Sequence, residues 1–397
     1  MSSYPLIKKV FIIVLWIAFS LVLSHFFASD LDIQRGLFIL LLCAGLWMSE
    51  IIPLPVTALL VPVLAYFFKI LTPAAAMAPF SNTIIFLFMG GFTLAALLNR
   101  YNIDLWLADR VIRFAGGSLW LSIVGFYGVT SILSMFISNT ATTAMMVPIA
   151  VSLIDKKFPR MRTMLLLGTA YAANIGGNGT VVGSPPNAIA AAALDLTFFE
   201  WFRVGFPTML AMFPLVIASL WFVIKPEKDA YVNKIDIATF QWSSRSKGAV
   251  ALFLFTIICW IFSSQISDLI SLKKFDHMIA ILITALAPAT GLISWKELEK
   301  KIGWGILIIF GGGLCLSSIL GSTGTTAWIA SSIFTSISNA PLWIILIISI
   351  AMMVFLTEIS SNTGSAAILV PVMFALSDQF NPAFAFAIVF GIGLAAN

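Results

Sequence analysis

The segment SNTATTAMMVPIAVSL at 138–153 is repeated in altered form as SNTGSAAILVPVMFAL at 361–376. Both copies begin with Ser-Asn-Thr inside an apolar stretch, and aligning them places Pro148 on Pro371. The copies lie 223 residues apart. A polar triplet duplicated at a fixed spacing within apolar sequence indicates a chain built from two structural repeats.

The composition is that of a membrane protein. Hydrophobic residues make up 60% of the chain and charged residues 10%, against roughly 25% charged in soluble domains. Several runs exceed the ~18 apolar residues that mark a membrane span. The basic residues lie between these runs, which is typical of cytoplasmic loops and argues against nucleic-acid binding. We therefore predict an all-α polytopic protein whose partner is the lipid bilayer.

The apolar runs predict an ordered series of helices. Lys8-Lys9 followed by a long apolar run resembles a signal peptide, but the run exceeds the 7–15 residues of a cleaved segment, so we interpret it as an uncleaved first span. The expected spans are 9–28, 36–51, 53–71, 82–99, 162–195 (broken), 204–224, 247–267, 275–292, 302–320 and 382–397.

Two stretches, 118–154 and 341–378, are too long for one crossing and polar in their middle. A re-entrant helical hairpin with Ser-Asn-Thr at its tip fits both features. Non-helical backbone at that depth is tolerated only where it is buried or lines a cavity. The triplets fit local helix capping, but two copies at equivalent positions favour a shared ligand site.

The charge distribution predicts the orientation. With both hairpins non-crossing and the N-terminus inside, seventeen Lys and Arg residues fall inside and five outside. We therefore expect a cytoplasmic N-terminus, a multi-pass protein of the inner (plasma) membrane, and hairpins that enter from opposite sides, as in inverted repeats. Segments 100–115 and 323–337 are predicted as amphipathic interfacial helices. The polar loop 225–246 joins the two halves.

A second polar cluster runs from Asn174 to Thr180 and on through Gly183-Ser184-Pro185-Pro186-Asn187. Consecutive prolines and several glycines break a transmembrane helix into two halves. The unwound carbonyls can then coordinate a cation while the half-helix N-terminus meets an anion. The glycine spacing does not fit a dinucleotide site. A plain packing kink remains an alternative, as does a silent glycosylation sequon at Asn178.

These motifs together resemble the divalent anion/sodium symporter family. The resemblance is carried by the two triplets, the Ser-Pro-Pro-Asn segment, the sequence EIIPLPVT at 50–57 and the segment Pro288 to Leu298, and it covers essentially the whole chain. It implies a homodimer in which each protomer moves a transport domain against a scaffold domain, an elevator mechanism. It also implies Na⁺ as the coupling ion and a small divalent anion as substrate.

The resemblance also implies site residues. The first sodium site would use Ser134, Ser138, Asn139 and the backbone of Gly183, and the second Thr357, Ser360 and Asn362. The substrate carboxylates would meet Ser138, Asn139, Thr140, Ser184, Pro185, Ser361, Asn362 and Thr363. Ser184 stands where many members have Thr and keeps the hydroxyl, so binding should survive.

The predicted site contains no Lys, Arg or His. A dianion there would be costly to desolvate, since one charge at membrane centre costs at least ~2.5–3.5 kcal/mol. Bound cations must supply the missing charge, which favours symport over sodium-independent exchange. We interpret Glu358, beside Thr357, as a buried carboxylate that stabilises the hairpin.

The predicted division of the chain follows the repeats. Residues 1–117 form the scaffold part of the first repeat, 118–203 its hairpin and broken helix, and 204–246 the connection. Residues 247–340 form the scaffold part of the second repeat and 341–397 its hairpin with the start of an incomplete broken helix. The counterpart of Ser-Pro-Pro-Asn would fall beyond Asn397, so we expect a truncated product with weak or no transport.

The sequence thus predicts a sodium-coupled symporter of C4 dicarboxylates such as succinate, malate or fumarate, and no enzyme. The alternatives are a sodium-independent dicarboxylate exchanger, a citrate or sulfate symporter, and an inactive fragment. A channel would lack paired hairpins. An intramembrane hydrolase would need a Ser with a His base, and His277 beside Asp276 starts a span away from the central serines.

Overall fold

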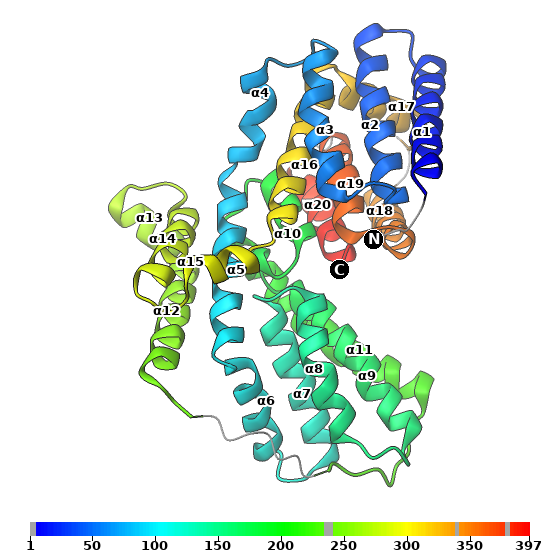
Figure 1. Cartoon of the computed structure of the whole chain (residues 1–397). Coiled ribbons are helices and arrows are strands. Elements are labelled where there is room, and N and C mark those ends of the chain that lie inside the picture. Colours follow the sequence, from blue (N-terminus) through cyan, green and yellow to red (C-terminus); the bar gives the residue numbers. More distant parts are fainter. Residues whose placement is uncertain (1–4, 234–240, 338–340, 378–381) are drawn as a thin grey trace. The chain divides into compact units, whose positions relative to one another are not determined.

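The computed structural model describes residues 5–233, 241–337, 341–377 and 382–397, and their regular elements are helices (Figure 1). One isolated antiparallel bridge joins Ile154 to Val232. Residues 234–240 of the predicted connecting loop, and residue 378 at the end of the second hairpin, lie outside the described part. The all-α prediction is confirmed.

The chain divides into two compact units, each assembled from separate stretches of sequence. The first unit contains α1 Leu6–Phe27, α2 Leu31–Ser49, α3 Leu54–Phe67, α4 Pro73–Met77, η1 Ala78–Ser81, α10 Pro185–Ala193, α16 Trp304–Ser322, α17 Thr325–Ile337, α18 Leu342–Ile359, α19 Asn362–Ser377 and α20 Pro382–Ala395. The second contains most of α5 Thr83–Arg100, then α6 Ile103–Phe114, α7 Leu119–Ser134, α8 Asn139–Leu153, α9 Pro159–Gly177, η2 Val181–Gly183, α11 Phe198–Ile224, α12 Ser244–Ile261, α13 Ser263–Ile270, α14 Phe275–Ala289 and α15 Trp295–Lys301. The predicted scaffold and transport parts are defined by their roles in transport and not by contacts, so that division of the chain stays a prediction.

Seven helical segments of the described chain are long and apolar enough to cross a membrane. They are Leu6–Phe27, Leu31–Ser49, Pro73–Arg100, Phe198–Ile224, Ser244–Ile261, Trp304–Ser322 and Leu342–Ile359. Shorter apolar helices include α3, α7, α14 and much of α19 and α20. Helices satisfy every backbone group internally, which lipid requires. The chain is therefore a multi-pass membrane protein.

Helices occur on both sides of each Ser-Asn-Thr. α7 ends at Ser134 and α8 begins at Asn139, while α18 ends at Ile359 and α19 begins at Asn362. The predicted helical hairpins therefore have their tips at the triplets. The arm α18 is itself long enough to cross a membrane, and the re-entrant course of both hairpins stays a prediction.

The predicted span at 247–267 is wrong in its extent. α12 ends at Ile261, and Phe262 separates it from α13, which runs to Ile270. Ser263 and Ser264 follow Phe262. Serine favours helix starts over helix interiors, which explains the interruption. The two predicted amphipathic segments are helices, α6 and α17.

Each repeat contains a glycine cluster, Gly90-Gly91 in α5 and Gly311 to Gly313 in α16, and both clusters lie at close helix contacts. A Cβ on Gly90 would lie 2.6 Å from the Cβ of Ala280, so α5 and α14 approach closely. A Cβ on Gly312 would lie 2.6 Å from the Cβ of Ala58, which brings α16 against α3. Small residues at such crossings let helix backbones meet in lipid, where packing replaces hydrophobic exclusion as the main attraction.

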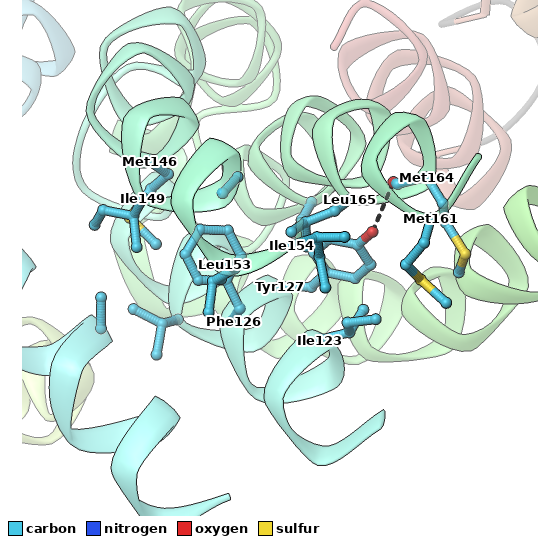
Figure 2. Close-up of a cluster of buried hydrophobic side chains, with 14 of the residues drawn as sticks. Ile123, Phe126, Tyr127, Met146, Ile149, Leu153, Ile154, Met161, Met164 and Leu165 are labelled. Atoms are coloured by element: carbon cyan, nitrogen blue, oxygen red, sulfur yellow. Dashed lines mark hydrogen bonds between the residues drawn. The ribbon is translucent and has the colours of Figure 1, made fainter. Parts of the chain in front are cut away.

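A buried apolar cluster unites α7, α8 and α9 in the second unit. Figure 2 shows Phe126 and Tyr127 of α7 among side chains of α8 and α9 that include Leu153 and Leu165. Tyr127 donates its hydroxyl proton to the carbonyl of Met164 at 2.7 Å, which satisfies the polar end of this side chain. The cluster fixes the first hairpin to α9.

The segment Pro226–Asn233, which we name the strap, follows α11 and crosses the turn between α8 and α9. Asn233 donates its backbone N–H to Leu153 O at 2.9 Å, and Lys157 Nζ donates to the Tyr231 hydroxyl at 2.7 Å. The strap therefore ties the base of the first hairpin to the end of α11.

The carboxylate of Glu227, within the strap, caps α9. It accepts the backbone N–H groups of Arg160 at 3.1 Å and Met161 at 2.7 Å, two of the groups that a helix start leaves unpaired. Partial desolvation raises the pKa of Glu227, but these hydrogen bonds outweigh it, and the net pKa lies below the usual 4.5. A lowered carboxyl pKa stabilises the fold above the unfolded value, and this contribution is lost as the pH falls through the folded value.

Replacing Glu227 by Gln should therefore lower the free energy of unfolding at neutral pH by about 1 kcal/mol. As the pH falls below about 4 the difference between variant and wild type should shrink, because the carboxylate of the folded wild type is then protonated progressively. Thermal unfolding in detergent, followed by intrinsic fluorescence at both pH values, measures this. Asp229→Asn, an exposed change in the strap, is the matched control, and an equal loss in both variants would contradict the cap.

Candidate functional site

The tip of the first hairpin is a capped helix start. Ser138 precedes α8, and its hydroxyl accepts the backbone N–H of Ala141 at 3.3 Å. Ser138 and Asn139 are half-buried and Thr140 is exposed. The local-capping interpretation is thus correct for Ser138, yet it leaves Asn139 and Thr140 available for other contacts.

Asn139 reaches from the hairpin tip to the end of α9. Its side-chain oxygen accepts the hydroxyl proton of Ser134 at 2.9 Å. A Cβ on Gly177 would lie 2.4 Å from that same oxygen, so only glycine leaves room for the carboxamide. Gly183 lies equally close to Gly177, because its Cβ would lie 2.4 Å from the Gly177 carbonyl oxygen.

The structure therefore brings three members of the first predicted sodium site, Ser134, Asn139 and Gly183, around Gly177. The cluster is lined by oxygen atoms: the Ser134 hydroxyl, the Asn139 carboxamide and the Gly177 carbonyl. Gly177 is also the last residue of α9, so this is the C-terminal end of a half-helix. Such ends, with unwound carbonyls, coordinate Na⁺ in transporters.

The break after α9 is held by specific hydrogen bonds. Thr180 accepts the N–H of Gly183 at 3.1 Å and donates to the carbonyl of Met135 in the hairpin tip. Trp201 of α11 donates its indole N–H to Asn178 O at 3.0 Å. These contacts hold an unwound segment between the end of α9 and the start of α10 at Pro185. A plain packing kink would not need them.

The tip of the second hairpin differs in its contacts. Thr357 donates to Val354 O of its own helix at 2.9 Å, and Asn362 is exposed. Ser361 accepts the N–H of Gly364 at 3.4 Å, which repeats the capping role of Ser138. The Ser360 hydroxyl is buried without a hydrogen-bond partner among the described residues. Of the second predicted sodium site, Ser360 is thus the member with an unused buried oxygen.

The prediction for Glu358 is wrong. Its side chain is exposed, not buried. The residue follows Thr357 on α18, and consecutive helix residues point about 100° apart, so proximity in sequence to the triplet did not place it inside. It does not act as a buried stabiliser of the hairpin.

All eight predicted substrate residues lie at helix starts. Ser138, Asn139 and Thr140 begin α8, Ser184 and Pro185 begin α10, and Ser361, Asn362 and Thr363 begin α19. Ser184 is 3% exposed and Thr363 half-buried. The positive end of a helix dipole and its unpaired N–H groups attract anions. The first hairpin belongs to one compact unit, and α10 and α19 to the other; a site shared by all three helix starts stays a prediction.

The structure adds residues that sequence reasoning missed. Asn397 donates its side-chain N–H to the Asn187 side-chain oxygen at 2.8 Å, which joins α10 to the C-terminal helix. Ser365, one turn into α19, has a buried hydroxyl with no hydrogen-bond partner in the described structure. Asn187 is part of the Ser-Pro-Pro-Asn motif, but its pairing over 210 residues has no local signal.

Neither acidic nor basic side chains form the predicted sites. Across the described residues, no group of three or more His, Cys, Asp or Glu side chains is placed to hold a metal ion. Cys43, Cys259 and Cys315 are buried and free, as expected for small core residues. The arrangement offers hydroxyl, carboxamide and backbone groups, which suit a hard monovalent cation and an anion better than a transition metal.

Gly177→Ala tests the sodium cluster without touching a predicted ligand side chain. The new methyl group would displace the Asn139 carboxamide, and we expect sodium binding about tenfold weaker, equivalent to about 1.4 kcal/mol. Radiolabelled sodium binding to the purified protein measures this. Gly128→Ala in α7 is the control, because a Cβ there meets nothing within 4 Å; equal effects in both variants would argue against the cluster.

The chain is similar to known transporters over most of its length. A family model described as CitMHS, citrate transporter, matches residues 44–393. An uncharacterized transporter of Haemophilus influenzae is 35% identical, covering 99% of this chain and 88% of the relative. A sodium-dependent dicarboxylate transporter, SdcS, of Staphylococcus saprophyticus is 30% identical, covering 96% and 80%.

The fold is also similar to a solved structure. The YdaH transporter of Alcanivorax borkumensis, described as having an unusual topology, superposes with a TM-score of 0.54 at 13% identity. The match covers 98% of this chain and 86% of that protein. At this identity the likeness concerns the fold alone.

Proposed function

Because this chain belongs to the citrate transporter (CitMHS) family, we propose that it is a sodium-coupled symporter of small divalent anions. The family membership and the relatives' names make it a transporter and not an enzyme. The resemblance found in the sequence is thereby confirmed at the level of the family. The preferred substrates in this proposal are C4 dicarboxylates such as succinate, malate and fumarate.

One observation carries the proposal: every predicted substrate residue lies at a helix start, and the first predicted sodium cluster joins one of these starts, at Asn139, to the C-terminal end of α9 at Gly177. The starts of α8 and α19 present N–H groups and hydroxyls, and the Ser184 hydroxyl precedes α10, whose first two residues are prolines without an N–H. These groups and the positive ends of the helix dipoles favour an anion. The C-terminal end of α9 presents carbonyls beside Ser134 and Asn139, which favour a cation. The two chemistries come from the two sides of one broken helix.

The absence of basic side chains in the predicted site supports coupling to a cation. Helix dipoles supply about half an elementary charge each, which is too little for a dianion brought to membrane depth. Bound Na⁺ would supply the remainder, so substrate binding should depend on sodium. The staphylococcal relative named a sodium-dependent dicarboxylate transporter is consistent with this proposal.

We also propose the location, the assembly and the motion of the whole protein. We place the protein in the inner (plasma) membrane with a cytoplasmic N-terminus, as the charge distribution favours. We further propose a homodimer and an elevator motion, with the re-entrant hairpins carrying the ligands.

Citrate is the second candidate substrate, because the matching family model is described as a citrate transporter. Citrate carries three carboxylates against two in succinate, so the same helix starts would have to balance more charge. Sulfate, and sodium-independent exchange of dicarboxylates, are the other outcomes that the transport assay has to separate.

Uptake of radiolabelled succinate into proteoliposomes tests the proposal. We expect accumulation under an inward sodium gradient and none when potassium replaces sodium. Accumulation that needs internal dicarboxylate but not sodium would show exchange and overturn symport. Competition by unlabelled citrate and sulfate ranks the substrates, and liposomes without protein give the background.

Substitution of Ser184 tests the start of α10. Ser184→Thr keeps the hydroxyl and should retain uptake. Ser184→Ala removes one neutral hydrogen-bonding group, worth about 0.5–1.5 kcal/mol, and should raise the succinate KM about two- to tenfold. Initial uptake rates at saturating sodium measure the difference, and an Ala variant that behaves as the Thr variant would remove Ser184 from the substrate site.

A further inference from the structure

An apolar groove of about 470 Å³ lies between the start of α7 and the end of α11. α7 contributes Trp120. The remaining lining residues come from α11: Pro214, Ile217, Ala218, Trp221 and Phe222. These positions follow the spacing i, i+3, i+4, i+7, i+8, so they form one continuous face of the helix. Both helices belong to the same compact unit.

The two tryptophans form one end of the groove, which we call the rim, and Pro214 lies at the other end. Trp120 and Trp221 pack edge to face with ring centroids 4.9 Å apart. They lie in the first turn of α7 and the last turn of α11, and Pro214 lies about two helical turns further along α11. Seven residues of helix span about 10 Å, so the groove is long enough to take part of an extended chain of methylene groups.

The surroundings identify the medium that this face meets. α11 is a 27-residue apolar helix that is mostly exposed, with Phe222 exposed by 73%. In a membrane protein such a face meets acyl chains. Tryptophan concentrates at the level of the lipid headgroups, which places the Trp120–Trp221 rim at the interface and the Pro214 end in the hydrocarbon.

The charges at the rim favour an anionic headgroup. Lys225 caps the end of α11 four residues after Trp221 and is exposed, and Lys228 in the strap is exposed as well. Of the nearby acidic groups, Glu227 already accepts two backbone N–H groups of α9. Asp229 is exposed and offsets only part of the positive charge. Basic residues beside a span attract anionic lipids with about 1 kcal/mol each.

We propose that this groove holds one acyl chain of a resident anionic phospholipid, whose phosphate lies against Lys225. The bound lipid fills the space between the first hairpin and α11 and so stiffens the support of the hairpin. The proposal rests on membrane insertion and the groove, not on sodium coupling or the identity of the substrate.

Native mass spectrometry of the purified protein, titrated with phosphatidylglycerol or phosphatidylcholine, tests the proposal. Wild type should retain one tightly held phosphatidylglycerol per chain in preference to phosphatidylcholine. Ala218→Trp fills the groove and should reduce this adduct at least tenfold. Leu215→Trp adds an indole on an exposed position of the same helix outside the groove, and it should retain the adduct.

Lys225→Gln should abolish the preference for phosphatidylglycerol while leaving chain binding in place, whereas an unchanged preference would remove Lys225 from the site. Retention of the adduct by Ala218→Trp would overturn the groove as the lipid site. A change from dimer to monomer in that variant, with the adduct unchanged, would show that a second copy of the chain covers this face and would equally overturn the proposal.

A second measurement keeps the test independent of the folding of Ala218→Trp. Phosphatidylglycerol brominated along its acyl chains should quench the fluorescence of Trp120 and Trp221 in the wild-type protein. The quenched fraction should fall in the double variant Trp120→Phe, Trp221→Phe. An equal quenched fraction in both proteins would place the lipid elsewhere.

Discussion

Hydrocarbon offers no hydrogen-bond partner to a backbone N–H or C=O, and this constraint shapes the chain wherever a helix is interrupted. At the first hairpin tip, Ser138 accepts the Ala141 N–H. In the break after α9, Thr180 accepts the Gly183 N–H and donates its hydroxyl proton to the Met135 carbonyl of the hairpin tip. Trp201 occupies the Asn178 carbonyl after α9. Side chains thus pair the backbone groups that each break leaves open, and the helix ends at these breaks are the groups that the proposed site would use.

In the proposed function, the same helix ends would separate the two ligands by charge. A helix start favours an anion and a helix end favours a cation, so a broken helix offers both within a few residues. Gly177 ends α9 against the Asn139 carboxamide, and Pro185 begins α10. This arrangement needs no charged side chain, whose burial in lipid would be costly. In the proposed function, each ligand would supply the charge that the other lacks.

The strap and the groove lie at the base of the first hairpin, where it is attached to neighbouring helices. The hairpin is fixed to α9 through the Tyr127 cluster and to the end of α11 through the strap. On its outer side a groove lined by Trp120 and Trp221 faces the bilayer. Packing at the base therefore holds the first hairpin in place, so the polar residues at its tip need not contribute apolar contacts.

The sequence by itself determined the helical membrane class, the approximate positions of most helices and the helix starts at both Ser-Asn-Thr triplets, because hydropathy, prolines and capping residues act over a few residues. It did not determine the break at Phe262, the exposure of Glu358 or the partner of Asn187. Those depend on which helix faces meet, and packing between distant segments leaves no local periodicity. Only the tertiary structure placed Asn139 against Gly177, because that contact exists only once α8 and α9 are packed together.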